Sequence, residues 1–287
     1  MSKIALYWDA AEDNGARCGL CPHRCYIADN GSGHCGVRQN RGGAVFASTY
    51  GVISSVALDP IEKKPLYMYR PDTRILSIGS YGCNLKCRFC QNYEISTDDR
   101  GTEDDNTPVP LSSLLRTAVQ TVPEGNIGIA YTYNEPLIAY ELLYDCASMV
   151  REAGLINVIV TNGYINQEPL LKLLPLIDAM NIDLKGFTED FYRKVGGTLT
   201  PVLETIKTAS KHCHVEVTTL VIPGENEDDV EPIAQWLSEI NPGIPLHLSR
   251  FFPRYLYSDR EPTPRETILR LRDAAKKHLK NVFAGNM

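Results

Sequence analysis

Three cysteines, Cys83, Cys87 and Cys90, form a C-x3-C-x2-C spacing in the run Tyr81-Gly82-Cys83-Asn84-Leu85-Lys86-Cys87-Arg88-Phe89-Cys90. Three thiolates on one short loop can hold three irons of a [4Fe-4S] cluster, and the fourth iron then has no protein ligand. A four-cysteine loop would give a closed electron-transfer cluster, and a zinc site usually combines two short cysteine pairs. The spacing therefore predicts an iron-sulfur site with one open iron, directly after a strand-like segment.

The elements that must position this loop alternate along most of the chain. Strand-like runs occur at residues 74–79, 126–132, 157–161, 179–183, 214–221, 245–249 and 281–284. Apolar residues at helical spacing fill residues 111–122, 137–153, 228–240 and 264–279. This alternation predicts parallel strands joined by helical crossovers. Six such units and a last strand are too few for a closed eight-fold barrel, so we expect an open, partial (β/α)6 barrel over residues 71–287, with its site at the carboxyl ends of the strands.

The first 70 residues have many glycines and little helical periodicity, and they contain Cys18, Cys21, Cys25 and Cys35. A segment this small needs a covalent or metal cross-link to fold stably. We therefore predict a cysteine-rich N-terminal subdomain, residues 1–70, with metal ligation ranked above a thioredoxin-like redox pair. Zinc and a second iron-sulfur cluster both accept four thiolates and stay equal alternatives.

The composition argues against two classes of protein, nucleic-acid-binding proteins and membrane-spanning proteins. The net charge of −6 gives no excess of basic residues to bind nucleic acid, and the chain has no apolar run long enough to cross a membrane. The N-terminal residues lack the pattern of a signal peptide, because an acidic residue, Asp9, follows too soon, and we therefore expect a cytoplasmic protein. In a reducing compartment the two cysteine groups indicate metal or cluster ligation, while Cys146 and Cys213 read as core residues.

The three-cysteine loop resembles the signature of the radical S-adenosylmethionine (SAM) superfamily, with Phe89 at its usual aromatic position. The resemblance implies that SAM chelates the open iron through its amine and carboxylate and is cleaved by one electron to methionine and a 5'-deoxyadenosyl radical. The protein then has to supply position, charge and exclusion of water.

Candidate partners for SAM stand at the ends of predicted strands. Glu135, in Tyr133-Asn134-Glu135-Pro136, takes the place of the acid in the superfamily's Gly-Gly-Glu-Pro run and would hold the methionine ammonium; Asn134 is a weaker match. Asp183 and Lys185 alternate and so share a face; Lys185 would bind the methionine carboxylate and Asp183 a ribose hydroxyl or a cation. His247 is a further candidate for cofactor contact.

The chain is similar along almost its whole length to the AmmeMemoRadiSam-system radical SAM enzymes, and through them to the pyruvate formate-lyase activating enzyme. The shared motifs include residues 18–40, 59–67, 82–92, 131–136, 181–185, 220–224 and 247–255. Members of this family often continue with a further cysteine pair, whereas this chain stops at Met287.

The resemblance implies an enzyme that abstracts hydrogen from a protein, peptide or small-molecule substrate, either as a glycyl-radical-enzyme activase or as a modifying enzyme with an unrelated substrate. It also implies an electron donor such as flavodoxin or ferredoxin. The alternatives are an iron-sulfur electron carrier without catalysis, which would need no barrel and none of Glu135, Asp183 and Lys185, and a zinc-stapled binding protein, which would leave Cys83, Cys87 and Cys90 unexplained.

Overall fold

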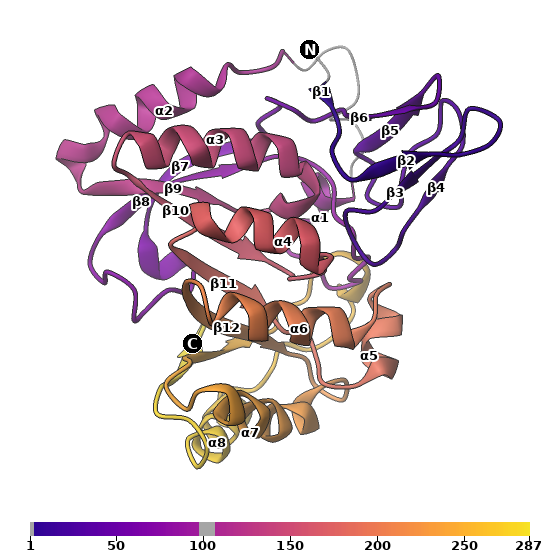
Figure 1. Ribbon diagram of the computed structural model, residues 1–287. Helices are drawn as coiled ribbons and strands as arrows, with labels where there is room; N and C mark the ends of the chain where they lie inside the picture. The colour runs from indigo at the N-terminus through magenta and orange to yellow at the C-terminus, as the bar shows by residue number, and fades with distance from the viewer. Residues whose placement is uncertain (1–2, 98–106) are drawn as a thin grey trace.

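An eight-stranded sheet forms the framework of the computed structural model, which describes residues 3–97 and 107–287 (Figure 1). Its strands follow one another in chain order: β7 (Ser55–Pro60), β8 (Arg74–Gly79), β9 (Asn126–Tyr131), β10 (Ile156–Thr161), β11 (Ala179–Asp183), β12 (His214–Val221), β13 (Leu246–Arg250) and β14 (Val282–Gly285). Strands β8 to β14 are parallel, and β7 pairs antiparallel with β8. In the described part of the chain no pairing joins β7 to β14, so the predicted open barrel is confirmed.

Helices between the parallel strands cover the outer face of the sheet (Figure 1). They are α2 (Leu111–Gln120), α3 (Tyr140–Glu152), α4 (Gln167–Leu173), α6 (Leu199–Ala209), α7 (Val230–Ile240) and α8 (Arg265–Ala275). Two short helices, α1 (Tyr93–Ser96) after the cysteine loop and α5 (Glu189–Lys194) after β11, stand at the carboxyl ends of the strands. Because β10 is covered on both faces, its sequence Ile-Asn-Val-Ile-Val-Thr is almost wholly buried and nearly continuous in apolar residues. The same property explains why the central strands could be found from the sequence.

Residues 61–70, which we call the strap, pass from β7 to β8 across the inner face of the sheet. Ile61 and Leu66 are fully buried there, in a cluster with residues of β8 to β11 such as Val158. The Asn181 side chain donates to the carbonyl of Pro65 over 2.8 Å. The division into domains at residue 70 stays a prediction, but β7 and the strap lie on its N-terminal side and nevertheless help to build the barrel.

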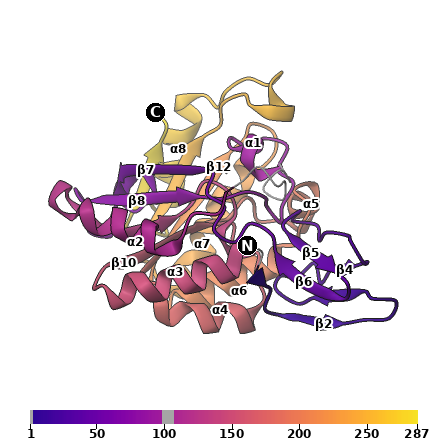
Figure 2. The same cartoon turned by 90° about the horizontal axis from the view of Figure 1, so that it is seen from above.

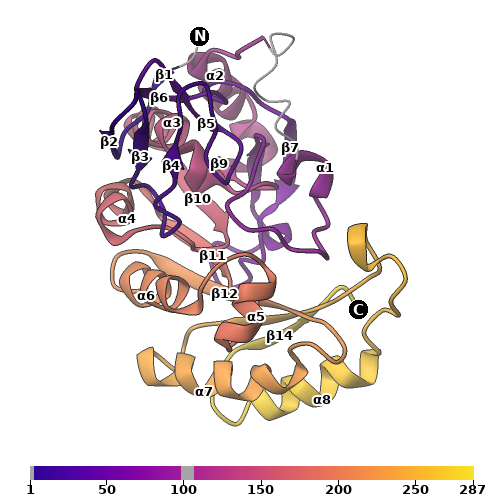
Figure 3. The same cartoon turned by 90° about the vertical axis from the view of Figure 1, so that its right-hand side faces the viewer.

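Two three-stranded antiparallel sheets form the N-terminal region. One contains β1 (Lys3–Ile4), β5 (Arg38–Arg41) and β6 (Ala44–Ala47); the other contains β2 (Trp8–Ala10), β3 (Ala16–Cys18) and β4 (Tyr26–Ile27). Figures 2 and 3 show them together at one end of the barrel. A buried ion pair, Arg38 to Glu141 of α3 at 3.2 Å, joins this region to the barrel, and Glu141 also accepts from the Leu6 amide. None of the described helices has both the length and the apolar character needed to span a membrane.

Candidate active site

A cavity of about 380 Å³ opens at the carboxyl ends of the parallel strands. The cysteine loop after β8, the turn after β9, the ends of β10 to β13 and the strap all contribute side chains to its wall. Residues that carry polar or ligating groups there are Lys63, Lys64, Cys83, Cys87, Cys90, Gln91, Asn92, Ser96, Thr132, Tyr133, Asn134, Glu135, Thr161, Asn162, Asp183, Lys185, Thr218, Ser249 and Asn286. The open barrel thus brings together residues that are up to 223 positions apart, from Lys63 to Asn286.

The cysteine loop is held in place by tight packing against the N-terminal region. Gly82 has a φ of +82°, and a Cβ at this position would lie 2.7 Å from the carbonyl oxygen of Cys35 and from a methyl of Val37. Cys83 Sγ accepts from the amide of Leu85 at 3.3 Å and from Asn162 Nδ2 at 3.6 Å. Any larger residue at position 82 would therefore displace the first cysteine of the loop.

All three thiols of the loop line the cavity. Burial raises the pKa of Cys83 well above its ordinary value and that of Cys87 to about 12, because it outweighs the hydrogen bond from the Leu85 amide to Cys83 and the charge of Lys185 near Cys87. Iron would compensate the buried thiolates and drive the protons off. In the described ranges no three His, Cys, Asp or Glu side chains are close enough to hold a single metal ion. A [4Fe-4S] cluster binds each thiolate at a different iron, so one loop facing one cavity fits it.

Glu135 caps the short 3-10 helix Pro136–Ala139 at the end of β9, and only 2 % of it is exposed. Its carboxylate accepts from the Thr161 hydroxyl at 2.6 Å, the Asn162 amide at 2.8 Å and the Leu137 amide at 3.0 Å. Burial raises its pKa to about 7, although these three donors act in the opposite direction. A cation bound beside it would favour the ionised form, so this wall of the cavity can hold an ammonium group.

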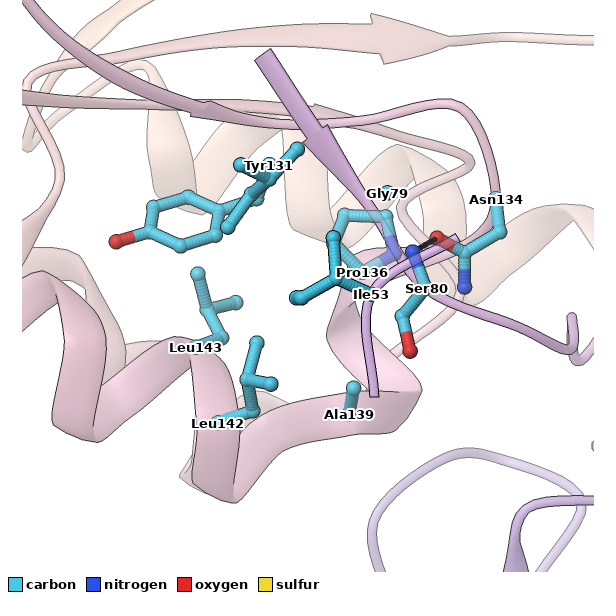
Figure 4. Close-up of a pocket in the computed structure, with 10 residues that line it drawn as sticks. Ile53, Gly79, Ser80, Tyr131, Asn134, Pro136, Ala139, Leu142 and Leu143 are labelled. Carbon is cyan, nitrogen blue, oxygen red and sulfur yellow. Dashed lines mark hydrogen bonds between the residues drawn. The ribbon is translucent and has the colours of Figure 1, made fainter. Parts of the chain in front are cut away.

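Asn134 has both of its polar atoms occupied by the start of the cysteine loop. Its oxygen accepts from the Ser80 amide at 2.9 Å (Figure 4). Its nitrogen donates to the carbonyls of Tyr81 and Gly82. The small apolar cavity drawn in Figure 4 lies between this turn and α3 and has room for about one water molecule, about 10 Å³. The contacts of Asn134 are those of a positioning residue, and its predicted contact with the cofactor stays a prediction.

Asp183 and Lys185 stand at the end of β11 with the Lys185 ammonium 2.6 Å from the Asp183 carboxylate. Burial acts to lower the pKa of Lys185, but the charges of Asp183 and Cys87 outweigh it and hold the pKa above its ordinary value. The lysine therefore stays charged beside the cysteine loop. The structure brings this pair and Glu135 to the same cavity as the three cysteines, as their strand-end positions predicted.

Phe89 and His247 differ in their access to the cavity. Phe89 lines it and is backed by Phe191 and Tyr257, with ring centroids 6.3 and 5.9 Å away. His247 is buried deeper in the barrel, with Nε2 2.6 Å from the carboxylate of Glu216. It is not among the residues that line the cavity, so its predicted contact with the cofactor has no support from this geometry.

Of the four N-terminal cysteines, Cys18 ends β3, Cys21 and Cys25 lie in the turn before β4, and Cys35 follows β4. In the described residues no three of these four thiols are close enough to share a single metal ion. The Cys18 amide donates to the Cys25 carbonyl at 2.9 Å, and burial, with smaller contributions from Cys35, Cys18 and Cys25, raises the pKa of Cys21 to about 12. This group adjoins the cysteine loop, because His23 Nε2 lies 2.7 Å from the carbonyl of Asn84. Its metal stays a prediction.

Several cavity residues were not assigned a role from the sequence. Thr161 and Asn162 were seen only as a turn signal, although both bind Glu135. Lys63, Lys64 and Tyr133 were part of motifs without chemistry, and only the fold of the strap places them on the cavity wall. The available signal was the position of Thr161 at the end of a predicted strand and of Tyr133 directly after one. The two lysines had no such signal in the sequence.

Comparison with known proteins identifies the family of the chain. The radical SAM superfamily profile matches residues 77–237, more than half of the chain. An uncharacterized protein of Methanocaldococcus jannaschii is 43 % identical over 99 % of this chain and 85 % of its own length. A candidate glycyl-radical enzyme activating enzyme of the same organism is 24 % identical over 72 % of this chain and 79 % of its own length. The pyruvate formate-lyase-activating enzyme of Clostridium pasteurianum is 29 % identical over 40 % of this chain and 48 % of its own length.

Among solved structures, Streptococcus suis SuiB bound to S-adenosylmethionine has a TM-score of 0.54 at 15 % identity, over 71 % of this chain and 48 % of its own. This likeness confirms the fold. The chain belongs to the radical SAM superfamily and is an enzyme of that type, and its relatives include activating enzymes. The family implies a [4Fe-4S] cluster and SAM as cofactors.

Proposed function

We propose that Cys83, Cys87 and Cys90 hold the [4Fe-4S] cluster and that SAM binds beside it. The observation that supports this proposal most directly is that the three thiols share one cavity with a buried carboxylate and a fixed ammonium group. When bound, the reduced cluster supplies the electron that splits SAM into methionine and a 5'-deoxyadenosyl radical. The chain's own residues orient the zwitterion of SAM and exclude water.

The charges on the cavity wall match those of the methionine end of SAM. Glu135 would accept hydrogen bonds from the ammonium, while Thr161 and Asn162 keep the carboxylate in position. Lys185 would bind the carboxylate, and Asp183 would hold Lys185 and a ribose hydroxyl. Phe89 would provide an apolar surface. Two opposite charges fixed on different strands would hold SAM in a single orientation.

We further propose that the radical abstracts hydrogen from a protein substrate, as in glycyl-radical activation. The support is that relatives over 72 % and 70 % of this chain carry the name of glycyl-radical enzyme activating enzymes. A one-electron donor such as flavodoxin or ferredoxin would reduce the cluster, and Lys86 and Arg88 of the cysteine loop are exposed to receive an acidic partner.

The test uses anaerobically reconstituted protein with SAM and dithionite. Release of 5'-deoxyadenosine, followed by chromatography, is the expected result, and a protein with a full cluster and reducing equivalents that releases none would contradict the proposal. Where the gene's neighbours encode a glycyl radical enzyme, addition of that enzyme should then give an organic radical signal in electron paramagnetic resonance. Deoxyadenosine release without that signal would leave the radical SAM assignment intact and reject the activase assignment.

A further inference from the structure

Two lysines of the strap reach the cavity from a different part of the fold than the residues assigned to SAM. Lys63 and Lys64 line it together with Pro65, whereas Glu135 and Lys185 come from the ends of β9 and β11. The strap, the purple loop after β7 in Figure 1, is rigidly held. Besides the bond from Asn181 to Pro65, Glu216 accepts from the amides of Tyr67 and Met68. The two ammonium groups are therefore presented by a fixed backbone.

Both lysines share a single carboxylate. Lys63 Nζ is 3.2 Å from Asp59 Oδ1 and Lys64 Nζ is 2.9 Å from Asp59 Oδ2. The Tyr133 hydroxyl donates to Asp59 Oδ2 as well, at 2.8 Å. Two positive charges against one negative charge leave this corner of the cavity with an excess of one positive charge.

Lys64 lies where water is scarce, because only 3 % of the residue is exposed, whereas the Lys63 side chain is 67 % exposed. An ammonium group has three N–H donors. In residues 3–97 and 107–287, Asp59 is the one acceptor hydrogen-bonded to the Lys64 ammonium, and the ring of Tyr133 lies 4.6 Å from Nζ. Donors remain for a ligand, and an anion would satisfy both the donors and the unmatched charge.

Tyr133 holds Asp59 and Lys64 in position while its own backbone is strained. Its φ is +74°, in the left-handed region that glycine adopts without strain. Strain of this kind persists where surrounding contacts determine the conformation. Here they are the bond to Asp59, the contact with Lys64 and a bond from Asn92 to the Tyr133 carbonyl at 2.7 Å. A glycine would relieve the strain and remove both side-chain contacts to the lysine corner.

We propose that Lys64, assisted by Lys63 and held by Asp59 and Tyr133, binds a carboxylate group of the substrate. The inference rests on the proposed function, since it places the substrate in the same cavity as SAM. One excess positive charge matches one carboxylate, whereas a phosphate dianion would leave negative charge unmatched. The carboxylate of SAM has its own partner in Lys185, so the lysine corner serves a second molecule. That carboxylate belongs to a peptide side chain, a peptide C-terminus or a free acid.

The test is calorimetric titration of the reconstituted, SAM-loaded holoenzyme with three carboxylate probes, each beside its carboxamide counterpart. The probes are acetyl-Gly-Asp-Gly-amide, acetyl-triglycine and propionate, which represent the three sources, and inorganic phosphate is titrated for comparison. We expect at least one carboxylate to bind with 1:1 stoichiometry and about tenfold more tightly than its carboxamide and than phosphate. Lys64→Met should abolish the difference, while Lys172→Met, an exposed lysine of α4, should preserve it.

In Lys64→Met the buried carboxylate of Asp59 loses one of its two positive partners, so this variant can fail to fold. The double variant Asp59→Asn, Lys64→Met is therefore tested beside it. The double variant has no unpaired buried carboxylate, and the amide introduced by Asp59→Asn would still offer the Tyr133 hydroxyl an acceptor. Equal binding of carboxylates and carboxamides by the wild-type protein, or an undiminished preference in a folded Lys64 variant, would overturn the proposal. So would a loss of SAM affinity in the Lys64 variants as large as that in Lys185→Met. Failure of the proposed function would show separately, as absence of 5'-deoxyadenosine from the wild-type protein.

Discussion

The Thr161 hydroxyl donates to the Glu135 carboxylate over 2.6 Å and so joins the ends of β9 and β10 inside the active-site cavity. The neighbouring Asn162 extends this link, because its amide bonds Glu135 while its side chain bonds Asn84 and the sulfur of Cys83. The carboxylate assigned to the SAM ammonium and the first cluster ligand are thus held by two consecutive residues of one strand end. Binding of SAM and binding of the cluster should depend on the same small set of contacts.

Cys87→Ala should abolish the cluster and with it SAM cleavage, because a cluster bound by two thiolates is poorly held. The measurements are iron and sulfide content, the visible charge-transfer band and 5'-deoxyadenosine release. Cys213→Ala is the matched control, since Cys213 is half-buried and its thiol, within the described part of the chain, donates to the carbonyl of Ala209 alone. Undiminished deoxyadenosine release from Cys87→Ala would contradict the assignment of the cluster.

Glu135→Gln and Lys185→Met should keep the cluster and weaken SAM binding. Each removes one charge partner of a zwitterion in a largely buried site, so the expected loss is on the order of 2 to 5 kcal/mol in binding free energy. Titration of the reconstituted variants with SAM measures it. Lys207→Met, whose lysine is exposed on α6 and pairs with Glu204, should bind SAM normally. Wild-type affinity in both site variants would mean that the two roles are wrongly assigned.

The cluster-free protein should lose stability between about pH 4.5 and 7 through Glu135. Burial raises the folded-state pKa of this carboxyl to about 7 from an ordinary value of 4.5. Its contribution is therefore fully present below pH 4.5 and is lost as pH rises through 7. The change should reach about 3 kcal/mol at pH 8, and Glu135→Gln should remove that part of the pH dependence. Urea unfolding of both proteins at pH 4.5 and 8 measures the difference, and parallel curves would refute it.

The strands of the barrel could be predicted from the sequence because buried parallel strands consist of nearly continuous apolar residues, as in β10. The C-x3-C-x2-C spacing pointed to Cys83, Cys87 and Cys90, and positions at strand ends pointed to Glu135, Asp183 and Lys185. All six line the cavity, and their roles stay predictions. Sequence patterns did not indicate the strap, since residues 61–70 have neither helical nor strand periodicity and are positioned by long-range bonds to Asn181 and Glu216. Helix α6 was missed as well, because Pro201 and its threonines weaken the helical pattern.

His247→Leu should destabilise the fold, whatever its effect on SAM. The histidine bonds Glu216, a fully buried carboxylate that also accepts from His214 and the strap. Burial acts to raise the pKa of Glu216, but the hydrogen bonds from His214 and His247 outweigh it and lower the pKa to about 2. Removing one donor should cost about 2 to 4 kcal/mol in unfolding free energy at pH 7.

Urea unfolding at pH 7 gives that cost, and SAM titration of His247→Leu and His247→Gln separates the two roles of this residue. Normal SAM affinity in a folded but destabilised variant would assign His247 to the support of the strap. A large loss of affinity without destabilisation would assign it to the cofactor, as the sequence predicted.

Cys21→Ala, Cys25→Ala should remove one metal equivalent and lower thermal stability, while the surviving protein still cleaves SAM when reduced chemically. We expect this because four thiolates close the coordination sphere of a metal, and the short strands β2 to β4 around them provide little core of their own. The double substitution can also reach the cysteine loop, because His23, between the two substituted cysteines, contacts the carbonyl of Asn84 in that loop. Metal analysis and electron paramagnetic resonance decide the nature of the site. One zinc beside one cluster would support a structural role, whereas two interacting clusters, or a well-folded double variant that no longer cleaves SAM, would assign the N-terminal cysteines to the redox chemistry.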